Sequence, residues 1–193
     1  MFSSVSRVSV GPFDLFVVGN SDLLDSSISN RRFAVAGSRR VSPGGASWLR
    51  SQVSRLTHDH VLVSGLALGS DSVAHHSALA YGVPQIAVLP CGFDRITPRS
   101  NIELARDIVA SGGCLVSLLP PSARASRFSY IARNEVIAFL GSMLIVPEFA
   151  VRSGTRHTVD FARNFGRYII VRDSPASGNQ FILNSNSYKT ISQ

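Results

Sequence analysis

Lysine is almost absent from this sequence: Lys189 is the only lysine among the 19 Lys and Arg residues of a 193-residue chain. A GC-rich genome, which favours arginine codons, is an alternative explanation for part of this bias. The formal net charge is nevertheless +7, and the isoelectric point lies near 10.4. Arginine guanidinium groups bind phosphates in a bidentate manner and stack on bases. The charge balance therefore favours a polyanionic partner.

Cysteine and long apolar segments are also scarce. Cys91 and Cys114 are the only cysteines and form no CxxC pair, so neither a disulfide framework nor a zinc site is expected. No apolar run reaches the roughly 18 residues of a membrane helix. The first ten residues lack the apolar core of a secretory signal. We expect a cytoplasmic protein with two buried thiols and no membrane association.

Several nucleotide and metal motifs are missing. The sequence has no Walker A lysine motif, which disfavours a P-loop NTPase, and no GxGxxG follows its first buried strand. It has no HExxH motif and no third ligand at metal-binding spacing beside Asp71 and His75. These absences lead us to expect neither a cofactor nor a metal ion.

Continuously apolar segments alternate with segments of helical spacing. Strands are expected at residues 16–18, 33–36, 61–63, 86–89, 114–117, 143–146 and 168–171, and helices at residues 45–56, 72–81, 102–111, 133–140 and 155–165. This alternation predicts an α/β protein with a Rossmann-like three-layer fold, in which helices flank a mostly parallel sheet. We expect an N-terminal extension at residues 1–14. A single domain at 15–193 should end in a short polar tail with a possible helix at 181–183.

Small or polar residues follow four of the expected strands. They are Gly37-Ser38-Arg39, Ser64-Gly65, Cys91-Gly92 and Pro147-Glu148. Ligands of open parallel sheets bind at the carboxyl ends of the strands, so these residues should meet at one edge. Glycines and helix N-termini there suit an anion, and Arg39 can contact a phosphate oxygen. A fifth loop, Ser153-Gly154-Thr155, offers hydroxyls and amides. Each loop alone is equally consistent with a simple turn.

Three acid-base residues have alternative interpretations. His75 follows Asp71 by four residues, so the two share a helix face, and a structural role is favoured over metal or acid-base chemistry. Glu148 follows an apolar strand and is a possible ligand-edge carboxylate for a ribose hydroxyl or a base edge. Glu148 is as readily explained as a helix-terminus partner or as an ion pair with Arg133.

Five segments together resemble one known family. They read FAVAGSRRVSPGG, VSGLALGSDSVAHHSAL, IAVLPCGFDRITPRSN, FSYIARNEVIAFLGSMLIVPE and SGTRHTVDFARNFGR. In this order they resemble the DNA-processing protein A family (DprA, also called Smf) from about Leu15 to Val171. The second segment is the most specific of the five.

The resemblance implies an extended Rossmann fold and a non-catalytic protein that binds single-stranded DNA in DNA processing and recombination. It also implies a homodimer, a RecA-type recombinase as partner, and a link to natural transformation. By motif position, the DNA- or phosphate-binding residues would be Gly37, Ser38, Arg39, Arg40, Ser64, Gly65, Ala67, Gly92, Arg133, Asn134, Ser153, Gly154 and Thr158. Further phosphate contacts are expected from Arg124, Arg127 and Arg156, and base stacking from Phe93, Phe128 or Tyr130.

The sequence departs from the family pattern where Glu135 replaces a basic residue and Leu118 an acidic one. The family's N-terminal helical and C-terminal winged-helix domains have no counterpart in it. Two alternatives stay open beside DNA binding. One is a nucleotide sensor or nucleotide hydrolase of the related Rossmann-like group, although its PGGxGT loop is replaced here by Ser153-Gly154-Thr155. The other is a scaffold that has lost DNA binding.

Overall fold

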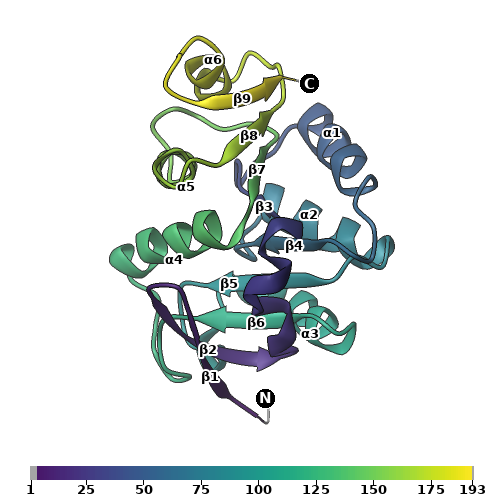
Figure 1. The fold of residues 1–193 in the computed structure, drawn as a ribbon, viewed down its shortest axis with the longest axis vertical. Coiled ribbons are helices and arrows are strands. Elements are labelled where there is room, and N and C mark those ends of the chain that lie inside the picture. The colour runs from purple at the N-terminus through teal and green to yellow at the C-terminus, as the bar shows by residue number, and fades with distance from the viewer. Residues whose placement is uncertain (1–3, 193) are drawn as a thin grey trace.

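The structure, a computed structural model, describes residues 4–192, which form one nine-stranded sheet (Figure 1). The strands are β1 (Ser6–Val10), β2 (Phe13–Gly19), β3 (Arg32–Val35), β4 (Val61–Ser64), β5 (Gln85–Leu89), β6 (Cys114–Ser117), β7 (Met143–Val146), β8 (Tyr168–Val171) and β9 (Lys189–Ser192). Across the sheet they follow the order β1-β2-β6-β5-β4-β3-β7-β8-β9. The two ladders that involve β2 are antiparallel, and the ladders from β6 to β9 are parallel. The predicted mostly parallel sheet is confirmed.

Helices cover both faces of this sheet. They are α1 (Pro43–Val53), α2 (Ser70–Ala80), α3 (Ile102–Ala110), α4 (Arg127–Leu140), α5 (Thr155–Asn164) and α6 (Ser177–Leu183), with short 3-10 helices η1 (Ser21–Leu24), η2 (Ser26–Arg31), η3 (Phe93–Arg95) and η4 (Arg99–Asn101). In Figure 1, α1, α2 and α3 lie towards the right of the sheet, and α4 and α5 towards the left. None of the helices within residues 4–192 has the length and apolar character needed to cross a membrane.

The strand residues alternate between two apolar cores. In β4, Val61 and Val63 pack in the core formed with α4, α5 and α6, whereas Leu62 packs against α1 and α2. Successive side chains of a strand point to opposite faces, and here both faces are covered by helices. This double burial explains why the central strands read as unbroken apolar runs in the sequence.

The element boundaries differ from the expected ones where capping or pairing decides them. Helix α4 begins six residues before the expected start because Ser126 and Ser129 form a capping box at its N-terminus. Residues 6–10, expected in an N-terminal extension, instead form β1 and pair with β2. In the polar tail, α6 is longer than the expected helix, and β9 extends the sheet beyond it. These two edge strands are largely exposed: only alternate residues of β1 are partly buried, and Lys189, Thr190 and Ile191 of β9 are exposed, so they gave little apolar signal.

The order in which strands join the sheet reverses at β3. The strand that follows it through α1, β4, pairs with one side of β3, and the later strand β7 pairs with the other side. The loops after β3 and β7 therefore leave the sheet towards opposite faces and open a space between them. This reversal positions the cavity described next.

Candidate functional site

A cavity of about 510 Å³ opens at the carboxyl ends of β4, β3 and β7. Its walls come from the loops that follow these strands, from the first half of α4 and from α5. The lining residues are Ala36, Gly37, Ser38, Arg39, Arg40, Ala67, Asp71, Tyr130, Arg133, Asn134, Ala150, Ser153, Gly154, Thr155 and Thr158. We call this space the first cavity. Its volume lies within the range of small-ligand sites, about 300–1,000 Å³.

Hydrogen bonds from two neighbouring loops hold the loop after β3. The Ser38 amide donates to the Glu148 carbonyl at 2.8 Å, and the Ser70 amide and hydroxyl donate to the Ser38 carbonyl at 3.0 and 3.1 Å. Thr155 Oγ1 donates to the Gly37 carbonyl at 2.9 Å. A Cβ on Gly37 would lie 2.4 Å from Ser70 Oγ, so the close approach of these loops requires glycine. Contacts within the protein therefore fix the backbone conformation of this wall.

Arg133 reaches the cavity from α4 with only 7% of its surface exposed. Its Nη1 lies 3.8 Å from Asp71 Oδ2 and donates to Asn134 Oδ1 at 3.1 Å. The Ala67 amide donates to the same Asp71 oxygen at 3.2 Å. Burial lowers the pKa of Arg133, and the Asp71 carboxylate raises it again. Since a guanidinium does not deprotonate in proteins, Arg133 holds a positive charge at the cavity wall.

The backbone after β4 makes room for this guanidinium. A Cβ on Gly65 would lie 2.0 Å from Arg133 Nη1, so a larger residue would displace the arginine. The next residue, Leu66, is fully buried and has a φ of 58°, in the left-handed region that few side chains adopt. Asn101 Nδ2 donates to the Leu66 carbonyl at 2.9 Å and supports this conformation. The turn brings Ala67 to the cavity wall.

The loop between β7 and α5 forms the opposite wall. Asn134 Nδ2 donates to the Gly154 carbonyl at 3.2 Å and ties this loop to α4. Ser153 Oγ is buried and, within the described residues, has no hydrogen-bond partner. A buried hydroxyl without a partner is costly unless a ligand or water satisfies it. Together with the cavity-lining Thr158, it offers hydroxyl groups to an incoming oxyanion.

The cavity lining is net positive. Arg39, Arg40 and Arg133 contribute three guanidinium groups, whereas Asp71 is the only carboxylate among the described lining residues. Arg39 is exposed, and its Cζ lies 5.3 Å from the centre of the Tyr130 ring; Arg133 Cζ lies 5.9 Å from the same centre. Backbone amides, hydroxyls, guanidinium groups and one aromatic ring are the groups that bind phosphates and bases.

Comparison with known proteins identifies the family. The sequence profile of DNA recombination-mediator protein A matches residues 3–188. The chain belongs to this family. The predicted DprA/Smf resemblance is thereby confirmed, and with it a relationship to proteins of DNA processing.

Relatives named DprA or Smf are between 27% and 36% identical to this chain over most of its length. DNA processing protein DprA of Streptococcus pneumoniae is 36% identical over 163 residues, which cover 84% of this chain and 56% of the relative. Protein Smf of Escherichia coli is 36% identical over 165 residues, which cover 85% of this chain and 43% of the relative. The chain thus spans about half the length of the curated relatives it matches.

The fold is also that of solved family structures. A structure of DNA processing protein A from Helicobacter pylori, described for its single-stranded DNA binding mode, superposes with a TM-score of 0.86. The alignment covers 97% of this chain and 91% of the other, at 24% sequence identity. At that identity the likeness establishes the Rossmann-like fold of the family and no more.

Most residues predicted from the family motifs meet in the first cavity. The lining includes the predicted Gly37, Ser38, Arg39, Arg40, Ala67, Arg133, Asn134, Ser153, Gly154 and Thr158. Gly65 lies directly behind Arg133 and permits its position. Glu135, which replaces a basic residue of the family motif, is not among the lining residues described for this cavity.

Besides Gly65, two predicted residues, Ser64 and Gly92, lie outside the lining. Ser64 is fully buried and donates to the Val35 carbonyl at 2.9 Å, so it joins β4 to β3. Gly92 packs against the loop at residues 120–123: its amide donates to the Ala123 carbonyl, and a Cβ would lie 2.1 Å from the Pro120 carbonyl. Both residues shape the carboxyl edge of the sheet rather than the cavity surface.

Glu148 has a structural set of partners. Its carboxylate accepts hydrogen bonds from the Ser42 amide at 2.5 Å and the Ser42 hydroxyl at 2.6 Å, at the start of α1. It also lies 3.4 Å from Arg172 Nη1. The structure therefore corrects the ligand-edge interpretation: Glu148 is a helix-terminus partner, and its ion pair is with Arg172, not with Arg133.

His75 is a core residue. It is fully buried, and its Nδ1 lies 2.7 Å from Gln85 Oε1 on β5. Within residues 4–192, no group of three His, Cys, Asp or Glu side chains is arranged to hold a metal ion. Asp71 and His75 lie four residues apart on α2, as predicted, but the Asp71 carboxylate pairs with Arg133. The sequence does not reveal this pair, because Asp71 and Arg133 are 62 positions apart.

Proposed function

We propose that the first cavity binds the phosphodiester backbone of single-stranded DNA. The observation that carries this proposal is Arg133, a charged guanidinium that is more than nine-tenths buried yet opens onto the cavity beside the exposed Arg39. Burial of an arginine is costly unless an anion compensates it, and Asp71 at 3.8 Å is not in direct hydrogen-bond contact. A phosphate in the cavity would complete the environment of both arginines.

The aromatic wall supports a single strand over a duplex. Tyr130 lines the cavity beside Arg39 and Arg133, and its ring offers a surface on which an unpaired base can stack. Stacking of a base on an aromatic side chain contributes about 1–3 kcal/mol and shows little sequence preference. Bases in a duplex are already stacked on one another and cannot enter a cavity of about 510 Å³. The structure of the Helicobacter pylori relative described for single-stranded DNA binding adds support.

Binding is proposed to leave the strand intact. The carboxylate that lines the cavity, Asp71, is engaged with the Arg133 guanidinium and the Ala67 amide, which leaves it poorly suited to act as a general base. The test is to incubate the protein with labelled oligonucleotide and with nucleoside monophosphates. Shortened DNA or free base as a product would contradict a non-catalytic role.

A single nucleotide is a second candidate ligand, because the cavity volume of about 510 Å³ also suits a molecule of that size. A thermal-shift screen separates the two. A mononucleotide that raises the melting temperature at micromolar concentration, without competition from oligo-dT, would favour a sensor. Stabilisation by oligo-dT that a mononucleotide reproduces only at millimolar concentration favours strand binding.

The role in recombination is proposed from family membership. We expect a homodimer and a RecA-type recombinase as partner, in the cytoplasm, and a link to natural transformation. Sedimentation at several protein concentrations tests the first expectation: a constant monomer mass would contradict it. A pull-down with a purified RecA-type recombinase, with and without oligo-dT, tests the second.

The main experiment measures affinity for oligo-dT by fluorescence anisotropy as salt increases. Three phosphate contacts predict a slope of log K against log salt of roughly −2, since each contact contributes about −0.7 for single strands. Arg39→Ala should weaken binding about fivefold at low salt and flatten the slope by about 0.7. Arg50→Ala is the matched control, because Arg50 is exposed in the last turn of α1, which runs away from the cavity. Undetectable binding, or binding independent of salt, would refute the proposal.

A further inference from the structure

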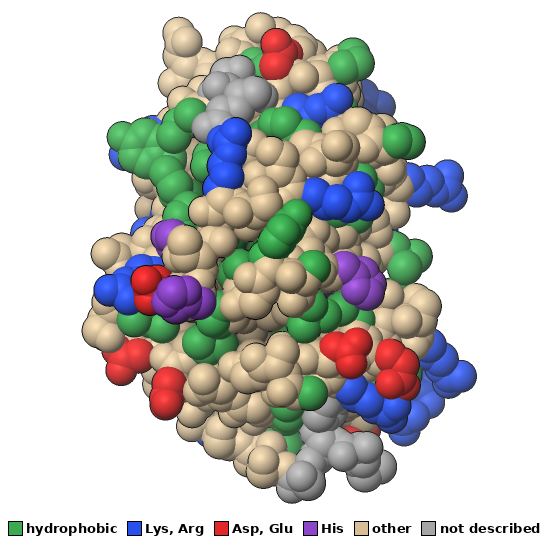
Figure 2. Space-filling view, turned by 90° about the vertical axis from the view of Figure 1, so that its right-hand side faces the viewer, with side chains coloured by type: hydrophobic (Ala, Val, Ile, Leu, Met, Phe, Trp, Pro, Cys, Tyr) green, Lys and Arg blue, Asp and Glu red, His purple; other side chains and the backbone are tan. Residues whose placement is uncertain are grey.

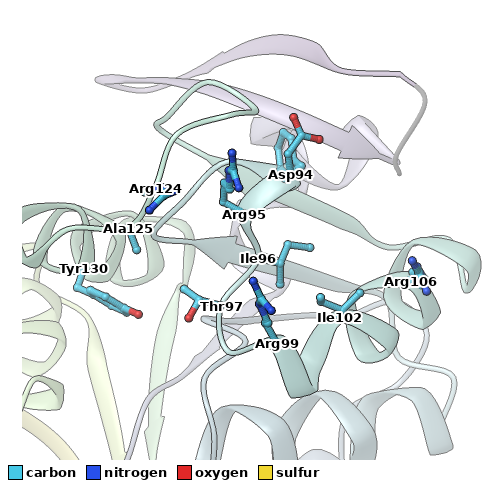
Figure 3. A pocket seen from close by; sticks show the side chains of 11 residues that line it. Asp94, Arg95, Ile96, Thr97, Arg99, Ile102, Arg106, Arg124, Ala125 and Tyr130 are labelled. Carbon is cyan, nitrogen blue, oxygen red and sulfur yellow. The ribbon is translucent and has the colours of Figure 1, made fainter.

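A second and larger cavity, of about 650 Å³, lies beside the first and is shown in Figure 3. It is formed by η3, η4, the start of α3 and the loop before α4. Its lining residues are Phe93, Asp94, Arg95, Ile96, Thr97, Arg99, Ile102, Arg106, Arg124, Ala125 and Tyr130. Tyr130 is thus shared by both cavities, and of the residues in this lining the sequence predicted DNA contacts for Phe93, Arg124 and Tyr130.

The second cavity carries four arginines. The side chains of Arg95, Arg99 and Arg124 are exposed and make no hydrogen bond or ion pair within the described part of the chain, whereas the side chain of Arg106 contacts Glu103. Asp94 is the only acidic residue described in this lining. The positive charge of the second cavity is therefore largely uncompensated within the protein, as expected of a site for a polyanion.

The rest of the lining is apolar. Ile96 and Phe93 are buried with 7% and 5% of their surfaces exposed, and Ile102 and Ala125 complete this surface. In Figure 3 the side chains of Ile96 and Ile102 lie between Arg95, Arg99 and Arg106. Guanidinium groups around an apolar floor match a nucleotide, whose phosphate is charged and whose base and sugar are not. An inorganic anion would leave the apolar part unused.

The two cavities are neighbours that share lining residues. A small hollow of about 90 Å³ lies between them, lined by Arg39, Ala67, Leu68, Thr97, Pro98, Tyr130 and Arg133. Arg39, Ala67 and Arg133 also line the first cavity, whereas Thr97 lines the second. In Figure 3, the Tyr130 ring extends from α4 towards Thr97. A strand that leaves the first cavity past Tyr130 therefore has a path into the second.

One side chain fixes the two cavities relative to each other. Asn101, the last residue of η4, donates from Nδ2 to the Leu66 carbonyl and to Ser72 Oγ, both at 2.9 Å. It links the segment that carries Arg99 to the turn that forms the wall of the first cavity. Asn101 is buried, with 7% exposed, so this link is shielded from water. The spacing between the two groups of arginines is thereby built into the fold.

We propose that the second cavity binds the next stretch of the same DNA strand, with Arg95, Arg99 and Arg124 on its phosphates and bases against Ile96 and Ile102. This proposal rests on the proposed function of the first cavity and extends it. Tyr130 marks the boundary between the two stretches. The protein then binds two successive segments of the strand, and affinity increases when an oligonucleotide is long enough to occupy both cavities.

The test compares two lengths of oligo-dT, about four and about twelve nucleotides, chosen within the range of single-strand site sizes. The double variant Arg95→Ala/Arg99→Ala removes two guanidinium groups that have no described partner in the protein, so it should not unfold the chain. We expect it to bind the long oligonucleotide about tenfold more weakly, with a salt slope flatter by roughly 1.4. Binding of the short oligonucleotide should change less than twofold.

The outcomes separate the two proposals. Arg39→Ala should weaken binding of both oligonucleotide lengths. Arg50→Ala should leave the binding of both lengths unchanged. If Arg39→Ala weakens binding but the double variant leaves the long oligonucleotide unaffected, the second cavity is not part of the DNA path. An equal loss for both lengths would mean that Arg95 and Arg99 act only through the general positive field, which also overturns this inference. If the unaltered protein binds neither length, the proposed function itself fails and the inference fails with it.

Discussion

Asp71 Oδ2 lies 3.8 Å from Arg133 Nη1, and both side chains are more than nine-tenths buried at the wall of the first cavity. The two residues come from different helices, α2 and α4, which lie on opposite faces of the sheet. Their charges meet over the carboxyl ends of β3 and β4. A buried charge without a partner is strongly destabilising, so each residue depends on the other.

Removal of the Asp71 charge should therefore destabilise the protein. In Asp71→Asn, the Ala67 amide keeps an acceptor but Arg133 loses its counter-charge, and we expect the free energy of unfolding to fall by about 3–5 kcal/mol. Denaturant unfolding measures this change. Asp71→Asn/Arg133→Met should recover most of the loss. Glu103→Gln, in an exposed pair with Arg106, is the control and should change little. A loss that the double variant does not recover would contradict the coupling.

The close contact between Gly65 and Arg133 predicts a specific loss of DNA affinity. In Gly65→Ala the new methyl group would stand 2.0 Å from the present position of Arg133 Nη1 and must displace the guanidinium. We expect affinity for oligo-dT to fall about tenfold, the equivalent of about 1.4 kcal/mol. Gly154→Ala serves for comparison of folding stability only, because no atom lies within 4 Å of its Cβ position but Gly154 lines the same cavity. Unchanged affinity in Gly65→Ala would show that the position of Arg133 is unimportant for binding.

Glu148→Gln should affect stability and leave DNA binding intact. The carboxylate accepts two hydrogen bonds from Ser42 at the start of α1 and lies beside Arg172, so its neutralisation should cost about 1–3 kcal/mol of folding free energy. Affinity for oligo-dT, measured well below the melting temperature, should stay within about twofold of the original. The opposite pattern, full stability with lost affinity, would restore Glu148 as a ligand residue.

The buried His75 predicts a loss of stability in mild acid. Burial lowers the pKa of His75 below its ordinary value of about 6.5, so the imidazole is neutral in the folded protein. As the pH falls below about 6.5, the unfolded chain takes up a proton that the folded chain does not. The free energy of unfolding should therefore decrease, with a slope of up to about 1.4 kcal/mol per pH unit from this residue.

Denaturant unfolding between pH 7.5 and pH 5, both approximate limits of the titration range of histidine, measures this slope. His75→Asn should lower stability overall but flatten the pH dependence. His58→Gln is the control, because the His58 side chain is 85% exposed. An identical slope in His75→Asn and the original protein would assign the acid sensitivity to other groups.

The two thiols should be unreactive in the folded protein. Burial raises the pKa of Cys114 to about 12 and also raises that of Cys91, and both side chains are fully buried. Since the thiolate is the reactive form, a disulfide reagent at pH 8 should label neither cysteine until denaturant is added. Rapid labelling of one thiol in the native protein would contradict this burial.

The sequence by itself determined the layered fold and most of the first cavity. Unbroken apolar runs such as Val61-Leu62-Val63 are the mark of strands buried on both faces, and the residues after parallel strands must meet at one edge. For this reason Gly37, Ser153 and their neighbours could be assigned to one site although they are over 100 positions apart in the chain. The edge strands β1 and β9 could not be predicted because their side chains are largely exposed, which leaves little apolar pattern in the sequence.

Only the tertiary structure decided which charged groups pair with each other and which line the cavities. Glu148 follows an apolar strand, which placed it near the cavity in the sequence-based interpretation. In the structure, the Ser42 amide and hydroxyl at the start of α1 donate hydrogen bonds to its carboxylate. The partnership of Asp71 with Arg133, and the second cavity around Arg95 and Arg99, depend on distances between loops from different crossovers. Electrostatic pairing acts over a few ångströms in space, whereas sequence patterns report the burial of each segment taken alone.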